Sequence, residues 1–409
     1  MPARALVAAL FLGGSACSII GPPALRQSRL QYNETVKVTS EQEMLLNIVR
    51  LRYADTPSSL AISNIAAQFE LAASAGATPF FAAGADQPFG TVLPQVGVGG
   101  ADRPTFSLTP LDDSNFVRRL FTPLSLDGAV YLARTTWPIQ TVFRLYLENL
   151  NWVPNAQSAS GPTPAQAPPP SGFREGIAAL QALQDRGDVV FGHEERVEAI
   201  GGPVPASSIT AEAAIQAVQQ GCELVPSSDG KTWQLQKRAR HYVMHLNPKA
   251  AGLAETKAFL SAFRLTPGRE KYDVTVDESP PFSGEEQLAR VDLETRSLLQ
   301  ALYFVAHGVE VPPEHLEKGL ARTTRSTDGK PFDWRVHLEG LFRVRSLPGS
   351  CDSDPREAHV AIEFNEHCFF IEGSDQDTKA TFALLMELSR LELPDQASKA
   401  PLLTIPLGR

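Results

Sequence analysis

The residue best placed to do chemistry is Cys17, which follows a short segment at the start of the chain. Arg4 supplies a positive charge, residues 5–12 form an apolar run, and residues 13–16 are all small. This order of a charged, an apolar and a small-residue region is typical of a secretory signal. The apolar run is much too short to span a bilayer. The reactive group is therefore a thiol at the expected point of cleavage.

The junction at Cys17 resembles the lipobox of bacterial lipoproteins. In such signals the thiol is diacylated, cleavage makes the cysteine the first residue, and its new amine is acylated. We predict that residues 1–16 are a signal peptide and that Cys17 is lipidated, although Gly14 stands where leucine is usual. An ordinary signal peptide with a chance cysteine is the alternative. Three acyl chains would anchor the chain stably, and Ser18 predicts an outer-membrane location, facing the periplasm.

The other cysteines are Cys222, Cys351 and Cys368. Cys351 and Cys368 flank one predicted strand, so a disulfide between them is feasible in an oxidising periplasm. Two free, partly buried thiols are the alternative. The spacing fits no zinc site, which needs paired C-x-x-C motifs or clustered histidines. We expect neither a metal nor a cofactor.

Known hydrolase motifs are absent from the sequence, which contains neither G-x-S-x-G nor H-E-x-x-H. Residues 228–231 fit S-x-x-K, but the Asp-Gly inside the motif predicts a hairpin turn. His241 and His245 lie about 13 Å apart along a predicted strand, too far to share one metal. His359 and His367 fit an exposed polar hairpin. We predict a protein that is not an enzyme.

The first part of the mature chain contains a helix and then strands. Ser40 and Glu43 form a capping box that predicts the helix start, and Pro57 stops the helix. Residues 60–108, rich in Ala, Ser and Gly, predict a long hairpin around a Gly- and Pro-containing connection, or two strands with a loose loop. Strands of about ten residues suit a bilayer. Their Ala-rich composition carries little apolar surface, which favours a position in water. Three helices are predicted next, at residues 112–121, 126–134 and 138–150.

Residues 154–172 have no hydrophobic periodicity and predict an extended, disordered Pro-rich linker. The linker divides the mature chain into a lipid-anchored N-terminal α+β domain (17–153) and a C-terminal α+β domain (173–409). In the second domain we predict helices at 173–184, 211–220, 254–263 and 285–306, strands at 188–200, 233–246, 342–344, 358–364 and 368–371, and a last helix capped by Ser374 and Asp377.

Together these segments predict an α+β fold. It has an N-terminal helix, a Gly/Ala-rich β-hairpin and further helices. A mixed helix and strand domain follows, and it ends in a β-hairpin plus a helix.

The composition of the 409 residues is that of a globular protein, with 43% hydrophobic and 20% charged residues. The 37 Lys and Arg against 46 Asp and Glu give a formal charge of -9, which argues against a nucleic-acid partner. Loss of residues 1–16 removes only Arg4 and makes the mature chain one unit more negative. Elsewhere no segment approaches 18 uninterrupted apolar residues, so we expect no membrane-spanning helix.

Five segments occur in this order along the chain: EQEMLLNIVRLRYADTP, DRPTFSLTPL, FVRRLFTPL, TWPIQTVFRLYLENLN and TRSLLQALYFVAHGVEVP. A closing module contains HVAIEFNEHCFFIEGSDQDTKATFALLMELSRLEL and APLLTIPLGR. This succession resembles an uncharacterised family of Gram-negative bacterial lipoproteins, over nearly all of the mature chain except the Pro-rich linker. The resemblance implies a lipid anchor and brings no activity, ligand or catalytic residue.

Three functions remain open at this stage. The first is a membrane-anchored envelope lipoprotein that acts as a non-enzymatic scaffold or interaction module, binding envelope proteins or itself. The second is an oligomeric export or pore accessory lipoprotein whose 68–108 hairpin joins copies of the chain. The third is an envelope enzyme of unknown class, which would need a pocket with convergent histidine or carboxylate groups.

Overall fold

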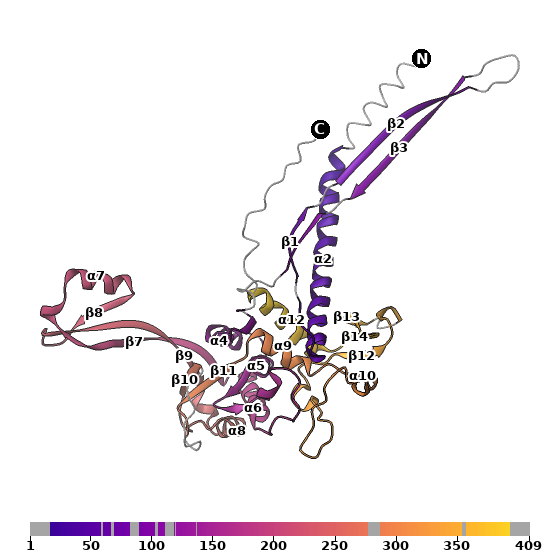
Figure 1. Cartoon of the computed structure of the whole chain (residues 1–409). Coiled ribbons are helices and arrows are strands. Elements are labelled where there is room, and N and C mark those ends of the chain that lie inside the picture. Colours follow the sequence, from indigo (N-terminus) through magenta and orange to yellow (C-terminus); the bar gives the residue numbers. More distant parts are fainter. Residues whose placement is uncertain are drawn as a thin grey trace, which may run out of the picture. The chain divides into compact units, whose positions relative to one another are not determined.

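The structure, a computed structural model, describes residues 17–58, 60–66, 69–81, 90–102, 105–110, 118, 120–135, 137–276, 287–353 and 357–392. The chain divides into two compact units. One unit, here named the body, comprises residues 1–57 and 118–390, and the other, named the hairpin unit, comprises residues 58–117 and 391–409. Helices and strands mix in the chain (Figure 1), so the predicted α+β fold is confirmed.

Helix α2 (Cys17–Arg52) begins far earlier than predicted. We placed its N-cap at Ser40, but Ser40 lies inside the helix, and its hydroxyl donates to the carbonyl of Val36 over 2.7 Å. A capping box is a local signal only, and no glycine or proline interrupts the chain between Ala24 and Ser40. The last turns of α2 are buried in the core through Leu45, Ile48, Val49 and Leu51.

A mixed sheet lies at the centre of the body, in the strand order β6-β5-β11-β10-β9-β7, with β8 paired to β9. Strands β10 and β11 run parallel, and the other neighbours run antiparallel. The strands are β5 (Leu147–Leu150), β6 (Val153–Pro154), β7 (Val189–Pro205), β8 (Cys222–Pro226), β9 (Thr232–Leu246), β10 (Lys271–Val276) and β11 (Arg290–Thr295).

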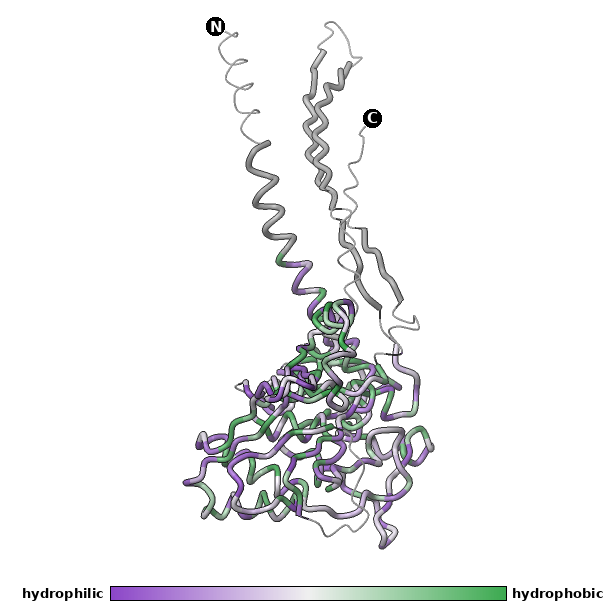
Figure 2. The backbone as a smooth tube through the Cα atoms, turned by 90° about the vertical axis from the view of Figure 1, so that its left-hand side faces the viewer, coloured by the Kyte–Doolittle hydropathy of each residue, from purple (hydrophilic) through white to green (hydrophobic). Residues whose placement is uncertain are grey.

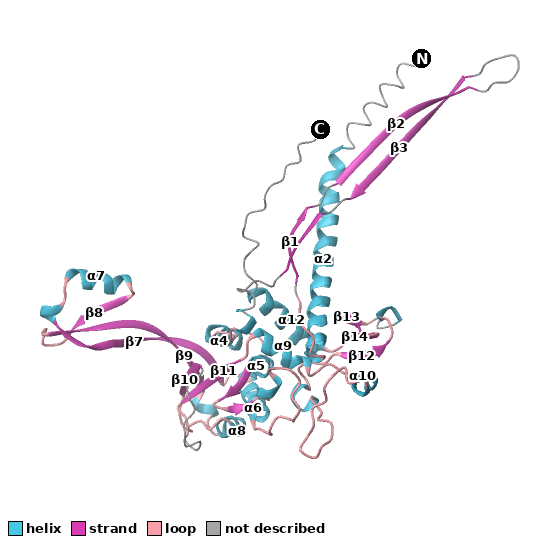
Figure 3. Cartoon of the chain, viewed as in Figure 1, coloured by secondary structure: helices cyan, strands magenta, loops and turns pink. Residues whose placement is uncertain are grey.

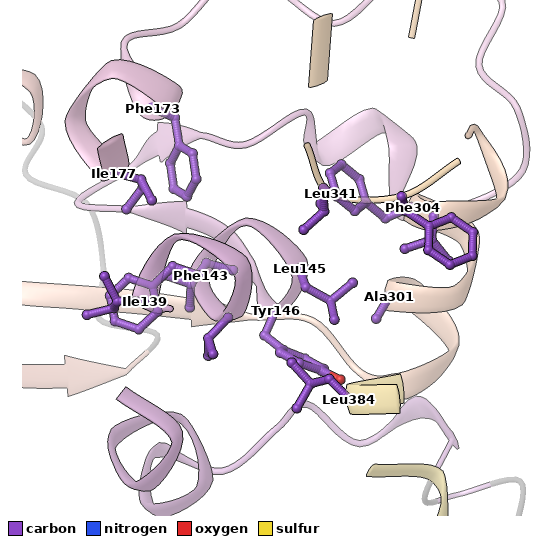
Figure 4. Packing of buried hydrophobic residues seen from close by; sticks show 14 of the residues in the cluster. Ile139, Phe143, Leu145, Tyr146, Phe173, Ile177, Ala301, Phe304, Leu341 and Leu384 are labelled. Carbon is purple, nitrogen blue, oxygen red and sulfur yellow. The ribbon is translucent and has the colours of Figure 1, made fainter. Parts of the chain in front are cut away.

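The helices of the body surround one hydrophobic core. In α5, apolar residues recur every three or four positions, which gives the helix one apolar face. Figure 4 shows α5 residues between residues of α6 and α9. In Figure 2 hydrophobic stretches run through the centre of the body, and hydrophilic ones are frequent at its periphery. The helices are α4 (Leu126–Arg134), α5 (Ile139–Tyr146), α6 (Phe173–Asp185), α7 (Ala211–Gln219), α8 (Ala254–Ala262), α9 (Leu298–Ala306), α10 (Pro313–Glu317), α11 (Arg335–Leu338) and α12 (Gln376–Glu392).

The prediction of one long helix over 285–306 was wrong, because strand β11 precedes α9 in that segment. The residues VDLET of β11 alternate apolar with polar, which is the period of a strand. Ser297 then starts α9, where Ser297 and Gln300 form a capping box. The helix predicted at 138–150 likewise ends at Tyr146, since β5 follows and pairs with β11.

Residues 154–172 differ from the extended linker that we predicted. Both flanks belong to the body, and Asn155, Ala156, Ala159 and Thr163 are buried. The guanidinium of Arg296 is fully buried, and it donates to the Ser160 hydroxyl over 2.8 Å and to the Asn155 carbonyl over 2.5 Å. A buried cation needs acceptors, and an irregular backbone segment can supply them. The segment is therefore packed despite its linker-like composition.

A second sheet, in the order β12-β14-β13, lies near the C-terminus, and α12 follows it. Its strands are β12 (Arg345–Pro348), β13 (Ala358–Phe364) and β14 (His367–Glu372). The predicted hairpin plus helix is confirmed, whereas the strand predicted at 342–344 begins later, at β12. Asp375, not Ser374, caps α12, because its carboxylate accepts the backbone N–H of Thr378 over 3.0 Å.

The hairpin unit contains two strand pairs, which confirms the long hairpin predicted over 60–108. Strands β2 (Phe69–Phe81) and β3 (Gly90–Asp102) pair antiparallel over their whole length, from Phe69 opposite Asp102 to Phe81 opposite Gly90. Strands β1 (Leu60–Ala66) and β4 (Thr105–Pro110) pair with each other. The helix predicted at 112–121 lies mostly outside the described residues.

Part of the body forms an extension that we name the arm, residues 189–241. Strand β10 pairs with β9 only over Tyr242–His245, and beyond that point β9 pairs with β7 and β8 alone. Figure 3 shows this three-stranded ribbon, with helix α7 beside its outer part. Thr210 caps α7, and Gly221 ends the turn after it with a positive φ of 71°. The predicted helix at 211–220 is thus confirmed.

Candidate functional site

The structure places Cys17, the predicted lipidation site, at the first residue of α2. From Cys17 to the buried Leu45 the helix measures about 42 Å at the usual rise per residue. Leu30 is 72% exposed and Val38 is 40% exposed, so this stretch of α2 is not packed into the core. An acyl group on Cys17 would therefore be held away from the core by a helical spacer. The signal at residues 1–16 lies outside the described residues.

Cys351 and Cys368 form a disulfide in the structure, which agrees with the bonded alternative. The bond joins a short 3-10 turn to strand β14. Beside it the carboxylate of Glu363 accepts hydrogen bonds from the Ser350 hydroxyl and the Cys351 backbone N–H, and these lower its pKa. The arrangement fixes a loop to the sheet. Cys222 is buried as a free thiol.

The other sequence candidates are dispersed. Residues 227–230 form the expected turn, closed by the Gly230 N–H donating to the Ser227 carbonyl. His241 lies 2.7 Å from Glu198, and His245 lies 3.6 Å from Glu194, so the two histidines pair with different carboxylates. Among the described residues no three His, Cys, Asp or Glu side chains gather where they could hold a metal ion.

The sequence analysis missed a cluster of aromatic and ionisable groups at the end of α2. The Tyr53 hydroxyl lies 2.7 Å from Nδ1 of His315, and the ring of His315 meets that of His367 at 4.5 Å. Nε2 of His367 lies 2.7 Å from the carboxylate of Glu314. Burial, followed by the nearby His367, lowers the pKa of His315. Because the cluster connects α2, α10 and β14, no local spacing in the sequence could reveal it.

The body also contains a pocket of about 530 Å³. Its walls come from the end of α2, the end of α9, α11 and the start of α12, and the lining includes Arg52, His307, Glu310, Asp333, Trp334 and Arg343. His307 is 5% exposed and its ring lies 4.2 Å from that of Trp334. The volume of the pocket is within the usual range for a small-molecule site.

Two buried groups of this pocket have unused hydrogen-bonding capacity. Nδ1 of His307 lies 2.7 Å from the Tyr303 carbonyl and donates to it, while within the described residues Nε2 has no partner. The Nε of Arg52 likewise has none in that part of the chain. Burial, then the charge of Arg52, lowers the pKa of His307 to about 4, so its ring is neutral at pH 7.

The pocket nevertheless has no evident nucleophile and base pair. Asp375 accepts from the hydroxyl and the backbone N–H of Thr378, and Glu310 and Asp333 pair with Arg343 and Arg335. These three carboxylates thus serve as a cap and as ion-pair partners. This arrangement can bind polar groups.

The arm carries a group of exposed apolar side chains. On α7, Ile215 is 59% exposed and Val218 is 70% exposed, although Ala217 is turned inward. Strand β7 adds Val197, Ile200 and Val204. We name these five residues the arm patch. Ile215 and Val218 lie three positions apart on α7 and so share one helix face. Adjoining exposed apolar residues are typical of protein interaction sites, whereas single ones are ordinary.

The register of the β2–β3 hairpin sorts its residues into two unlike sets. Residues directly opposite each other share a face, and the faces alternate along each strand. One set, named the apolar face, contains Phe69, Leu71, Ala73, Ala75, Ala77, Pro79 and Phe81 of β2 with Gly90, Val92, Pro94, Val96, Val98, Gly100 and Asp102 of β3, so that its one charged residue lies at the end. The other set contains the polar residues Glu70, Ser74, Thr78, Thr91 and Gln95 together with Ala72, Gly76, Phe80, Leu93, Gly97, Gly99 and Ala101. The hairpin is therefore amphipathic.

No protein-family model, curated protein or solved structure matches this chain. None of the helices in the described part of the chain combines the length and the hydropathy of a membrane-spanning segment.

Proposed function

We propose that this chain is a lipid-anchored protein of the Gram-negative outer membrane that acts by binding other envelope proteins, as a non-enzymatic scaffold or interaction module. The lipobox-like leader and the resemblance to an uncharacterised lipoprotein family support the location. The observation that carries the binding function is the arm patch, because its five apolar side chains are exposed on α7 and β7 of the arm.

The arm has the features of a presented surface. Its strands are fixed near the body by charge pairs, since the Arg196 guanidinium donates to the Asp273 carboxylate over 2.6 Å and Lys271 lies 2.8 Å from Glu194. Farther out, α7 turns Ile215 and Val218 to solvent. Exposing valine and isoleucine to water is unfavourable, so the patch is best explained by a partner that covers it.

The lipid anchor would act with the arm by holding it at the membrane surface. Helix α2 joins Cys17 to the core through a continuous backbone, and its buried end is fixed by apolar packing. A rigid spacer of this kind restricts the distances at which a partner can be reached. Anchoring and binding would then be separable, with Cys17 responsible for one and the arm patch for the other.

Two experiments test these parts separately. Cys17→Ala should move the protein from the membrane pellet to the soluble fraction, and a variant that still sediments with membranes would contradict anchoring. A photocrosslinking amino acid at Val218 should give a discrete higher-mass adduct in intact cells, whereas the same amino acid at the exposed Lys231 of the arm should not. Equal yields at both positions would contradict the arm patch as a binding surface.

The second candidate is an oligomeric export or pore accessory lipoprotein. One specific observation favours it: the amphipathic register of the β2–β3 hairpin. Neither the arm patch nor the anchor conflicts with this function, because an oligomeric accessory protein also needs a membrane location and partners.

A further inference from the structure

We propose that the β2–β3 hairpin inserts into a lipid bilayer, with its apolar face against the acyl chains. This inference rests on the proposed envelope location of the chain. The small residues that made the composition look unsuited to lipid lie on both faces of the hairpin, but the polar residues do not. The register places Glu70, Ser74, Thr78, Thr91 and Gln95 on one face, together with Phe80 and Leu93, whereas the valines, the prolines, Leu71, Phe69 and Phe81 share the other face with Asp102 at its end.

The length of the hairpin fits the thickness of a bilayer. Strands β2 and β3 have 13 residues each and are paired from end to end. A tilted strand needs about 9–11 residues to cross the hydrocarbon layer. The strands are long enough for this crossing, with residues left over at the ends.

The positions of charged and aromatic residues mark the ends of the segment that would lie in the bilayer. Residues 71–81 and 90–101 contain no Asp, Glu, Lys or Arg, and the charged residues of the two strands are Glu70 and Asp102, at the open end of the hairpin. On the apolar face, Phe69 and Phe81 stand at opposite ends of β2. Apolar bands bounded by aromatic residues are typical of strands that contact lipid.

Insertion has a consequence for the edges of the hairpin. Within the described residues β2 and β3 pair only with each other, so each strand has one edge without a backbone partner. Unpaired N–H and C=O groups are not tolerated in hydrocarbon. The inserted state therefore requires hairpins from further copies of this chain, paired edge to edge into a closed ring, with the polar faces turned to the ring interior.

The test is a cysteine scan of β3 in the full chain. Cys17→Ala removes the anchor, so the result does not depend on lipidation, and Cys222→Ser removes the free thiol of the body. Single cysteines at Gln95, Val96 and Val98 are labelled with an environment-sensitive fluorophore. Each protein is then reconstituted from detergent into phosphatidylethanolamine and phosphatidylglycerol vesicles. Val197→Cys in the arm is the matched control, since it lies on the long β7–β9 ribbon, which carries charged residues.

We expect labels at 96 and 98 to be quenched by brominated lipid and to lose quenching by aqueous iodide. Labels at 95 and 197 should keep their iodide quenching. Equal iodide quenching at 95, 96 and 197 in vesicles would overturn the proposal. So would protection of 96 that is already complete in detergent-free buffer without vesicles, because a protein surface would then cover the face. A reconstituted protein that remains monomeric by light scattering would overturn the edge pairing. None of these outcomes depends on Cys17, so they are distinct from a failure of anchoring.

Discussion

The hairpin β2–β3 and the β7–β9 ribbon of the arm share a backbone pattern and differ in residue content. Both are long antiparallel pairs. The arm ribbon places charged residues opposite each other, as at Glu195 with Arg240 and Glu198 with Lys237, whereas the central parts of β2 and β3 have no charge at all. Backbone pairing alone therefore does not decide whether a two-stranded ribbon is suited to water or to lipid. The alternation of residue types along it does.

The largest expected effect comes from giving the hairpin a charge of the kind that the arm carries. Val96→Arg puts a cation near the middle of the apolar face, and a lipid-facing arginine at the bilayer midplane costs about 2–4 kcal/mol. We expect the variant to lose hairpin insertion. The measurement is the protection of a label at position 98 from iodide quenching. Val197→Arg in the arm should change the free energy of unfolding by less than about 0.5 kcal/mol. If the Val96→Arg variant inserts as the parent chain does, position 96 does not contact acyl chains, and the contrast between the two ribbons fails.

Acid should destabilise the body and leave hairpin insertion unchanged. The folded pKa of His307 is about 4, below an unfolded value of about 6.5, so between these values the unfolded chain binds more protons. The contribution of His307 is complete above pH 6.5 and is lost as the pH falls towards 4, by about 3 kcal/mol at most. Residues 71–81 and 90–101 contain no titratable side chain. Hairpin insertion should therefore not follow this pH profile.

Denaturant titration between pH 7 and 4 measures this loss in the body. His307→Asn retains a side-chain donor for the Tyr303 carbonyl and removes the titrating ring, so its stability should fall less steeply with acid. His337, whose pKa burial also lowers to about 4, will leave a residual slope. Identical slopes for the variant and the parent chain would show that His307 does not control the acid response.

The same contrast explains what could be predicted from the sequence. The hairpin was predictable because its alternation and its turn signals are local, but which residues share a face needed the register. The end of α5 and the division of 285–306 into β11 and α9 depend on pairing between β5 and β11, distant in sequence. The packing of residues 154–172 depends on Arg296. The pocket and the Tyr53 cluster join distant positions, so no spacing indicates them.

A smaller effect is expected at the base of the arm. Arg196 donates to Asp273 through two nitrogens, and this bond raises the pKa of Arg196 and lowers that of Asp273. Because both groups are partly exposed, we expect a coupling of about 1 kcal/mol or less, weakened by salt. A double-mutant cycle of Arg196→Ala and Asp273→Ala measures it. Residues 71–81 and 90–101 of the hairpin contain no Asp, Glu, Lys or Arg, so hairpin insertion should be insensitive to salt. A coupling between Arg196 and Asp273 that salt leaves unchanged would contradict the assignment.

The smallest effect on stability, with the clearest effect on binding, is expected at the arm patch. The double variant Ile215→Ser and Val218→Ser removes exposed apolar area only. The free energy of unfolding should therefore change by about 0.5 kcal/mol or less, as for ordinary surface substitutions. The photocrosslinked adduct should disappear, while the vesicle labels at positions 95 and 96 should keep their alternation. The arm would then bind protein and the hairpin lipid, each through its own apolar residues. If the double variant also abolishes insertion, the two ribbons act as one surface, and the division between a protein-facing and a lipid-facing ribbon fails.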